Sequence, residues 1–160
     1  MKKIGIFLLI FFLLVGCQAQ TKDEDKQFSE YKKIKTNLIQ QTHFDDEFPF
    51  SIQVVYNELD DGYRYDVVIN QVQEDIYDLN VVAYTDESDE QMCPTIGLFD
   101  EEQYNLKVDF VDKANGFYKG VRISGTTTQI QNVKVYVQYY TDESLKNSVE
   151  KYIEVKNETR

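Results

Sequence analysis

The chain has 160 residues, of which 28 are acidic and 17 are basic, and its formal net charge is −11. This length suits one domain with short appendages, because two hydrophobic cores would leave each half too small to fold well. The surplus of negative charge repels phosphates, so the composition argues against nucleic acid as a partner.

The first sixteen residues follow the pattern of a signal peptide. Lys2 and Lys3 form a cationic start, and an apolar run over residues 4–15 follows them. As a helix with a rise of about 1.5 Å per residue, this run covers roughly 18 Å. A stable span must cross a hydrocarbon core of about 30 Å. The pattern therefore favours a cleaved signal peptide over residues 1–16 rather than a transmembrane anchor.

The apolar run ends at a cysteine, Cys17. Residues 14–17 read LVGC, which resembles the lipobox of bacterial lipoprotein precursors, such as small surface lipoproteins of Gram-positive bacteria. The resemblance implies diacylglycerol transfer to the Cys17 sulfur and cleavage between Gly16 and Cys17, which leaves the lipidated protein on the extracytoplasmic face of the cell membrane. Two acyl chains hold a protein firmly, whereas one anchors it only marginally. The alternative is an ordinary secretory peptide with a chance cysteine at its end.

The lipidated chain would be more acidic still. Loss of Lys2 and Lys3 leaves 15 basic residues against 28 acidic ones, a formal net charge of −13. Lipidation of Cys17 leaves Cys93 as the only thiol, so no intramolecular disulfide is possible. We expect Cys93 to be a small residue beside Pro94 at the start of a strand, with pairing between chains or chemical reaction as the alternative.

A polar segment separates the cysteine from the first amphipathic pattern. Residues 18–27, QAQTKDEDKQ, contain no apolar side chain larger than alanine and predict a flexible tether over 17–27. Apolar residues then recur at steps of three and four from Phe28 through Tyr31 and Ile34 to Leu38. This spacing predicts an amphipathic helix over 28–44.

From residue 48 onward, the hydrophobic period becomes two, which is typical of half-buried strands. Asn115 and Gly116 suit a hairpin turn before residue 117. The strands that this pattern predicts fall near residues 50–56, 63–69, 77–83, 106–110, 117–124, 133–139 and 149–155, with a weaker one at 95–99. Short strands without intervening helices predict a mainly β fold, an immunoglobulin-like antiparallel sandwich of seven or eight strands over 48–156. A small barrel is the alternative.

Several apolar side chains fall on the outward positions of these strands. Either the helix packs on them as a second small core, or they form a docking surface. They are Val55, Val68, Val82, Tyr84, Tyr136 and Tyr140.

The sequence offers little for catalysis. His43 is the only histidine, and we expect it to be a helix cap or a surface residue. No CxxC, GxSxG or GxGxxG motif occurs, so the sequence predicts no enzyme, no catalytic residue, no cofactor and no dedicated metal site. A catalytic function would require two or more of four carboxylates to meet in one concave site; these are Asp86, Glu90, Asp100 and Glu102.

Acidic clusters in the predicted turns are candidate cation ligands. Ca²⁺ takes six to eight oxygen ligands, which loops at one end of a sandwich could supply. None of the clusters has the spacing of a dedicated calcium loop, so solvated turns are the other interpretation. The candidates are Asp86, Glu87, Asp89, Glu90, Asp142 and Glu143.

The anchor pattern and the missing catalytic motifs together indicate a function. We expect a membrane-anchored extracytoplasmic lipoprotein, a non-enzymatic binding or interaction module whose partner is an envelope protein or polymer. The alternative is a lipoprotein that binds a cation or small ligand through its acidic loops.

Overall fold

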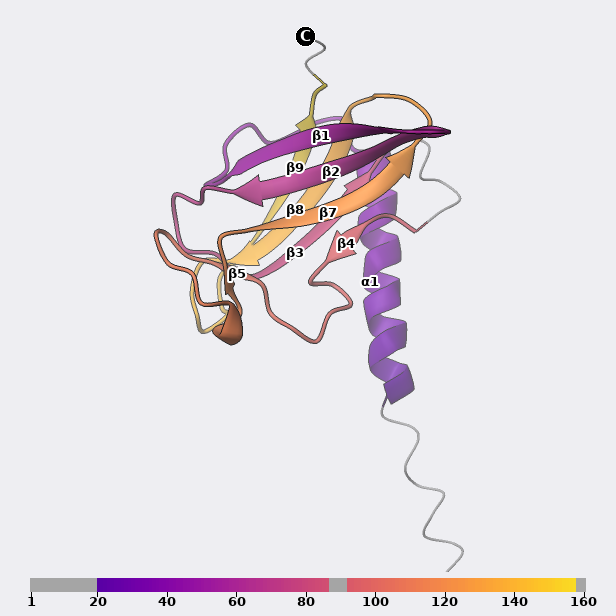
Figure 1. Cartoon of the computed structure of the whole chain (residues 1–160). Coiled ribbons are helices and arrows are strands. Elements are labelled where there is room, and N and C mark those ends of the chain that lie inside the picture. Colours follow the sequence, from indigo (N-terminus) through magenta and orange to yellow (C-terminus); the bar gives the residue numbers. More distant parts are fainter. Residues whose placement is uncertain (1–19, 87–91, 158–160) are drawn as a thin grey trace, which may run out of the picture.

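A computed structural model of the chain describes residues 20–86 and 92–157 (Figure 1). The predicted signal peptide and the predicted cleavage site before Cys17 lie outside these ranges, so lipid attachment stays a prediction. Within the described residues, no helix combines the length and the apolar run that a membrane crossing requires.

Two antiparallel sheets pack face to face (Figure 1). The three-stranded sheet has the order β1 (Ser51–Leu59), β2 (Gly62–Asn70), β7 (Gly120–Thr127). The four-stranded sheet has the order β4 (Thr95–Ile96), β3 (Tyr77–Tyr84), β8 (Val133–Tyr140), β9 (Ser148–Val155). The chain passes from the three-stranded to the four-stranded sheet between β2 and β3 and again between β7 and β8, and it returns between β4 and β7, as in immunoglobulin-like folds. The predicted mainly β, immunoglobulin-like sandwich is confirmed.

The main core lies between the two sheets. Alternate residues of β2, beginning with Tyr65, face alternate residues of β3 and β8 across it. Its fully buried side chains are Tyr65, Val67, Ile69, Ile76, Leu79, Val81, Leu106, Val133, Val135 and Val137. Gly125 lies opposite Tyr65 on β7, and a Cβ there would stand 2.5 Å from the tyrosine ring. The sandwich closes over this ring because β7 has no side chain at that position.

The strand predicted over residues 106–110 is wrong. Only β5 (Asn105–Leu106) is extended, and it pairs in parallel with β6 (Phe117–Tyr118). Asp109 has φ 55°, and the Phe110 amide donates to the Lys107 carbonyl at 3.3 Å, so the chain turns where the alternating pattern predicted a strand. The predicted hairpin is correspondingly reduced to a turn. It contains the 3₁₀ helix η2 (Lys113–Asn115) and is closed by paired backbone bonds between Asp112 and Phe117.

The helix is longer at its start than predicted. α1 spans Gln20–Gln40, so the predicted flexible tether is wrong from residue 20 onward. Extending an existing helix costs little, because each added residue contributes a hydrogen bond while the unfavourable nucleation step is already made. The Glu, Lys and Gln residues of this segment favour a helix and can therefore continue it. In Figure 1, this N-terminal part of α1 extends beyond the sheets.

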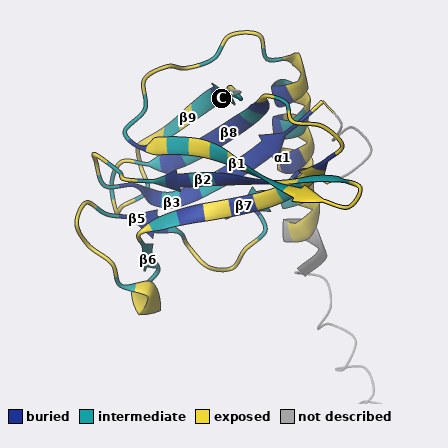
Figure 2. Cartoon of the chain, turned by 45° about the horizontal axis from the view of Figure 1, so that its top comes forward, coloured by how far each residue is buried: buried dark blue, intermediate teal, exposed yellow. Residues whose placement is uncertain are grey.

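The C-terminal half of α1 packs on the outer face of β3 and β8. Tyr31, Ile34 and Leu38 are buried in a second apolar cluster with Val82 and other residues of this face. Because β3 and β8 have the main core on one side and α1 on the other, both strands are mostly buried, whereas β1 and β7 alternate with exposed residues (Figure 2). The predicted amphipathic helix is confirmed, and it ends at Gln40 rather than at residue 44.

Cys93 belongs to this second cluster. The residue is 2% exposed, and its backbone amide donates to the Tyr31 hydroxyl at 2.7 Å. It lies directly before Pro94 and β4, as the prediction of a small residue beside Pro94 at the start of a strand states. Burial raises the pKa of Tyr31 to about 12, so the phenol remains protonated at neutral pH.

We expect Leu38→Ala to lower the free energy of unfolding by about 2–5 kcal/mol, because truncation leaves a cavity between α1 and the sheet. Leu38 is fully buried, whereas its neighbour Ile39 is 42% exposed. Ile39→Ala is therefore the matched control, with an expected loss of no more than about 0.5 kcal/mol. Urea unfolding of the two variants measures the difference. Equal losses would contradict the packing of α1 on the sheet.

Candidate binding face

The outer faces of the two sheets are not equivalent. α1 covers Val82, Tyr84 and Tyr136 on the four-stranded sheet, while Tyr140 lies half-buried at the margin of the helix. No described helix or sheet packs across the outer face of the three-stranded sheet. We call this surface, formed by the outward side chains of β1, β2 and β7, the open face. The outward apolar residues of the four-stranded sheet therefore pack against α1, whereas those of the three-stranded sheet have no described element over them.

Strand register sets which side chains meet on the open face. Val55 on β1, Asp66 on β2 and Ser124 on β7 form one cross-strand row. Arg64 and Arg122 stand on either side of Asp66 in the neighbouring rows, because residues two apart on a strand share a face. The open face is therefore mixed, with a carboxylate at its centre between two guanidinium groups.

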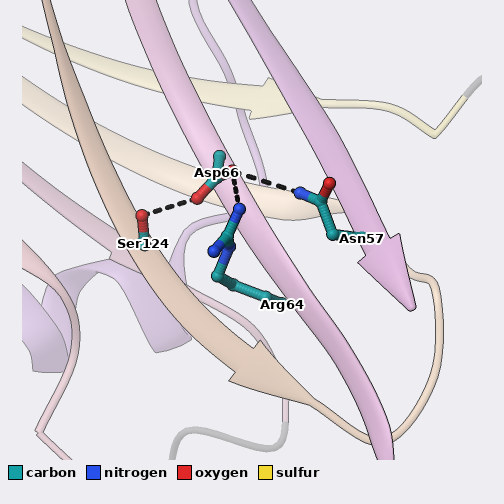
Figure 3. A network of polar contacts seen from close by, with 4 residues as sticks. All are labelled: Asn57, Arg64, Asp66 and Ser124. Atoms are coloured by element: carbon teal, nitrogen blue, oxygen red, sulfur yellow. Dashed lines mark hydrogen bonds and ion pairs between the residues drawn. The ribbon is translucent and has the colours of Figure 1, made fainter. Parts of the chain in front are cut away.

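Asp66 holds a network of three side chains (Figure 3). The Ser124 hydroxyl donates to one carboxylate oxygen at 2.6 Å. Arg64 donates to the other oxygen at 3.1 Å, and the Asn57 amide donates to the same oxygen at 3.2 Å. The carboxylate side chain is only 6% exposed, whereas the Arg64 side chain is 49% exposed. Buried carboxylates need such partners, since an unpaired buried charge is costly.

These contacts keep Asp66 ionised. The hydrogen bond from Ser124 is the largest cause that holds the pKa of the Asp66 carboxyl below its usual value, and Arg64 and Arg122 act in the same direction. Burial acts in the opposite direction and is outweighed. Both oxygens accept hydrogen bonds from the protein itself, so Asp66 organises the open face rather than offering a free base.

A groove lies at one end of the open face, where β2 ends and β7 begins. Its volume is about 900 Å³, and we call it the loop groove, because the turn over residues 107–111 forms one wall. That wall presents Val108, Phe110 and Val111, and the opposite wall includes Val68. Among the residues that the structure describes, three basic side chains line the groove, Lys107, Lys119 and Arg122. One acidic side chain, Asp109, lines it as well.

A second hollow of about 940 Å³ lies at the other end of β2, beside the turn between β1 and β2. Its lining includes Asp61 and a run of threonines. Among the described residues, no basic residue contributes to this lining. Exposed apolar side chains occur in both places, including Leu59 and Met92 in this hollow, but only the loop groove combines them with basic residues.

The candidate cation ligands do not converge as far as the structure describes them. Asp86 follows the end of β3 and Asp142 follows the end of the antiparallel neighbour β8. The two therefore lie at opposite ends of the sheet, separated by roughly 25 Å for strands of this length. Glu87, Asp89 and Glu90 lie outside the described residues. Among residues that are described, no group of three or more His, Cys, Asp or Glu side chains could hold a metal ion.

Asp142 uses its carboxylate within its own turn. It accepts hydrogen bonds from the Ser144 hydroxyl and from the Asn147 amide and side chain, both of the latter at 3.0 Å. The bond from Ser144 is the largest cause that lowers the pKa of Asp142 to about 2. Glu143 accepts a hydrogen bond from the Tyr77 hydroxyl at 3.4 Å. These contacts match the solvated-turn interpretation, and no observation on the described residues favours cation binding.

Of the carboxylates considered for catalysis, Asp86 is apart from Asp100 and Glu102, which both lie near Tyr104. Asp100 accepts a bond from the Gly97 amide at 2.7 Å, and Glu102 accepts one from the Tyr118 hydroxyl at 3.4 Å. Gly97 lies against Leu79 near the start of β3, whereas Asp86 follows its end. No concave site joins Asp86 to Asp100 or Glu102 within the described part of the chain, and Glu90 lies outside it.

His43 is an exposed residue after α1, and its Nδ1 lies 3.0 Å from the Thr42 hydroxyl. The end of the helix is capped by another residue. The Lys134 ammonium donates to the carbonyls of Ile39 and Gln41, each at 3.3 Å. Of the two roles predicted for His43, the surface role is the one observed. A lysine on β8 takes the cap position because cations are favourable at a helix C-terminus.

No protein-family model matches the chain, and no curated protein is significantly similar to it. Its function must therefore be argued from its surfaces. Sequence reasoning missed the Asp66 network, although one signal was present: an aspartate stands between valine and tyrosine in the middle of a strand pattern. It also missed the loop groove, because the alternating pattern predicts a strand over residues 106–110, whereas the turn over residues 107–111 forms one wall of the groove.

We expect Asp66→Asn to lower the free energy of unfolding at pH 7 by about 1–3 kcal/mol, because the charged hydrogen bonds weaken. The pKa of Asp66 is lower in the folded protein than in the unfolded chain. Its contribution is therefore complete above the unfolded pKa near 4 and disappears as the pH falls through the folded pKa. Denaturant unfolding between pH 7 and pH 3 should show the two proteins converging as the pH falls.

Asp61→Asn is the control, because Asp61 is an exposed residue of the turn between β1 and β2. A difference between wild type and Asp66→Asn that stays constant over this pH range would show that the charge of Asp66 has no stabilising role.

Proposed function

We propose that the protein is a membrane-anchored extracytoplasmic lipoprotein, a non-enzymatic module that binds an envelope protein or polymer through the open face. The observation that carries the proposal is the asymmetry of the sandwich. One outer face is covered by α1, whereas the other presents apolar and charged side chains with no described element over them.

The exposed apolar residues of the open face support a binding role. Val55 is 43% exposed on the edge strand β1, in the same cross-strand row as Asp66, and Val68, one row away, leads into the loop groove. Single exposed apolar residues are ordinary on protein surfaces. An exposed apolar group rimmed by arginine and polar side chains is instead typical of an interaction surface.

The position of α1 supports the anchoring role. Cys17 precedes the start of the helix at Gln20 by three residues. A helix of 21 residues is about 31 Å long, and its N-terminal end extends away from the sheets (Figure 1). With lipid on Cys17, α1 would act as a stiff spacer that holds the open face clear of the headgroups.

We expect Cys17→Ala to release the protein from the membrane fraction of cells, because the thioether attachment point is lost. Fractionation followed by immunoblotting measures the distribution, and Cys93→Ala is the matched control, since its thiol is buried in the folded domain. Retention of a processed Cys17→Ala protein in the membrane fraction would contradict lipid anchoring.

We expect a photo-cross-linking residue at position 55 to give a discrete adduct in intact cells, because Val55 is an exposed residue of the proposed binding face, in the same cross-strand row as Asp66. The control is position 39, since Ile39 is 42% exposed, close to the 43% of Val55, but lies on α1. Gel mobility and mass spectrometry identify the adducts. Equal adduct yields from the two positions, or none from position 55, would argue against the open face as the binding surface.

A further inference from the structure

We propose that the loop groove binds an extended acidic segment of a partner protein, with apolar side chains of that segment against residues 108–111 and its carboxylates on Lys119 and Arg122. This inference rests on the proposed function, because it names the partner chemistry of the open face.

The apolar wall of the groove is exposed although the turn that carries it is folded. Val108, Phe110 and Val111 are 42%, 45% and 50% exposed. The Phe110 ring lies edge-on to the ring of Phe117 at a centroid distance of 5.4 Å, so its orientation is set within the protein. These side chains offer apolar area that a partner could remove from water.

The turn is tied to the sandwich before any partner binds. Ile76 and Leu106 exchange backbone hydrogen bonds of 2.8 and 2.9 Å at its base. The Val108 amide donates to Asp75 at 3.1 Å, and the Lys107 ammonium lies 3.7 Å from the same carboxylate. A prearranged wall loses little conformational entropy on binding, which favours affinity.

The charges of the groove select an anionic partner. Lys107 is paired with Asp75, and Arg64 on the open face is paired with Asp66. Neither Lys119 nor Arg122 forms an ion pair within residues 20–86 and 92–157. Arginine can bind a carboxylate through two parallel hydrogen bonds, which adds geometric selectivity. Lys119 and Arg122, which form none of these ion pairs, outnumber the one carboxylate of the groove, Asp109. Such an excess of cations beside an apolar wall, in a chain of net charge −11, favours carboxylates interspersed with apolar side chains.

The shape of the site favours a polypeptide segment over a membrane. A concave site of about 900 Å³ can enclose part of an extended chain, whereas a lipid bilayer is flat on this scale. The strongly acidic protein would also be repelled by anionic headgroups. A protein segment can place its carboxylates on Lys119 and Arg122 while the remaining acidic surface stays at a distance.

The test uses the full chain in non-ionic detergent, immobilised through its C-terminus, to select from a phage library of random twelve-residue peptides. The expected result is enrichment of peptides that combine Asp or Glu with Leu, Ile or Phe. The most enriched peptide is then synthesised and titrated against the wild type and three double variants by fluorescence anisotropy.

Lys119→Glu with Arg122→Glu should weaken peptide binding at least about tenfold, which corresponds to 1.4 kcal/mol. Lys146→Glu with Lys156→Glu changes the net charge equally but lies outside the groove, so it should alter the dissociation constant less than about twofold by screened long-range effects.

Val108→Ser with Val111→Ser should weaken binding several-fold through lost apolar contact. If the first variant does not fold, Lys119→Gln with Arg122→Gln replaces it.

Three results would overturn the inference. The first is selection without acidic enrichment, or equal weakening by the groove and control variants. The second is hydrogen-exchange protection of residues 107–111 when the full chain is placed in vesicles containing phosphatidylglycerol but not in phosphatidylcholine vesicles, which would identify a membrane as the occupant. The third is self-association that Lys119→Glu with Arg122→Glu abolishes, which would identify a second copy. An adduct from position 55 without acidic peptide selection would leave the proposed function standing and this inference refuted.

Discussion

Each sheet of this sandwich has two faces. The main core uses one face of each sheet, and α1, the one α-helix among the described residues, can cover only one of the two outer faces that remain. The core takes the inner face of both sheets. α1 takes the outer face of β3 and β8, where Leu38 is fully buried. The outer face of β1, β2 and β7 therefore meets solvent as far as the chain is described. This division of surfaces buries both faces of one sheet and leaves the outer face of the other available for the binding role proposed above.

A carboxylate at the centre of the open face organises the side chains around it. Asp66 is nearly as buried as the residues of the core, so its charge requires the hydrogen bonds that Ser124, Arg64 and Asn57 supply. Those bonds link β1, β2 and β7 on the side away from the core. They also turn Arg64 inward toward Asp66, which leaves Arg122 and Lys119 as the cations available at the loop groove.

The helix connects this surface to the proposed anchor. The cluster around Tyr31 and Leu38 fixes α1 to the sheet opposite the open face. The orientation of the open face is therefore fixed relative to the axis of α1. A flexible tether would have left that direction free. Continuation of the helix to Gln20 instead carries the orientation of the domain nearly to Cys17.

Local periodicity by itself determined the strands, the turns between most of them and the buried stripe of α1, because these depend on residues a few positions apart. It failed at residues 106–110, where the positive φ of Asp109 turns a chain that alternates like a strand. Tertiary structure alone decided which sheet the helix covers, and it brought Asn57 and Ser124, which lie 9 and 58 residues from Asp66, onto one carboxylate. It also placed the turn at 107–111 against the start of β7. Strand order and register are set by contacts between distant segments, so no local pattern in the sequence contains them.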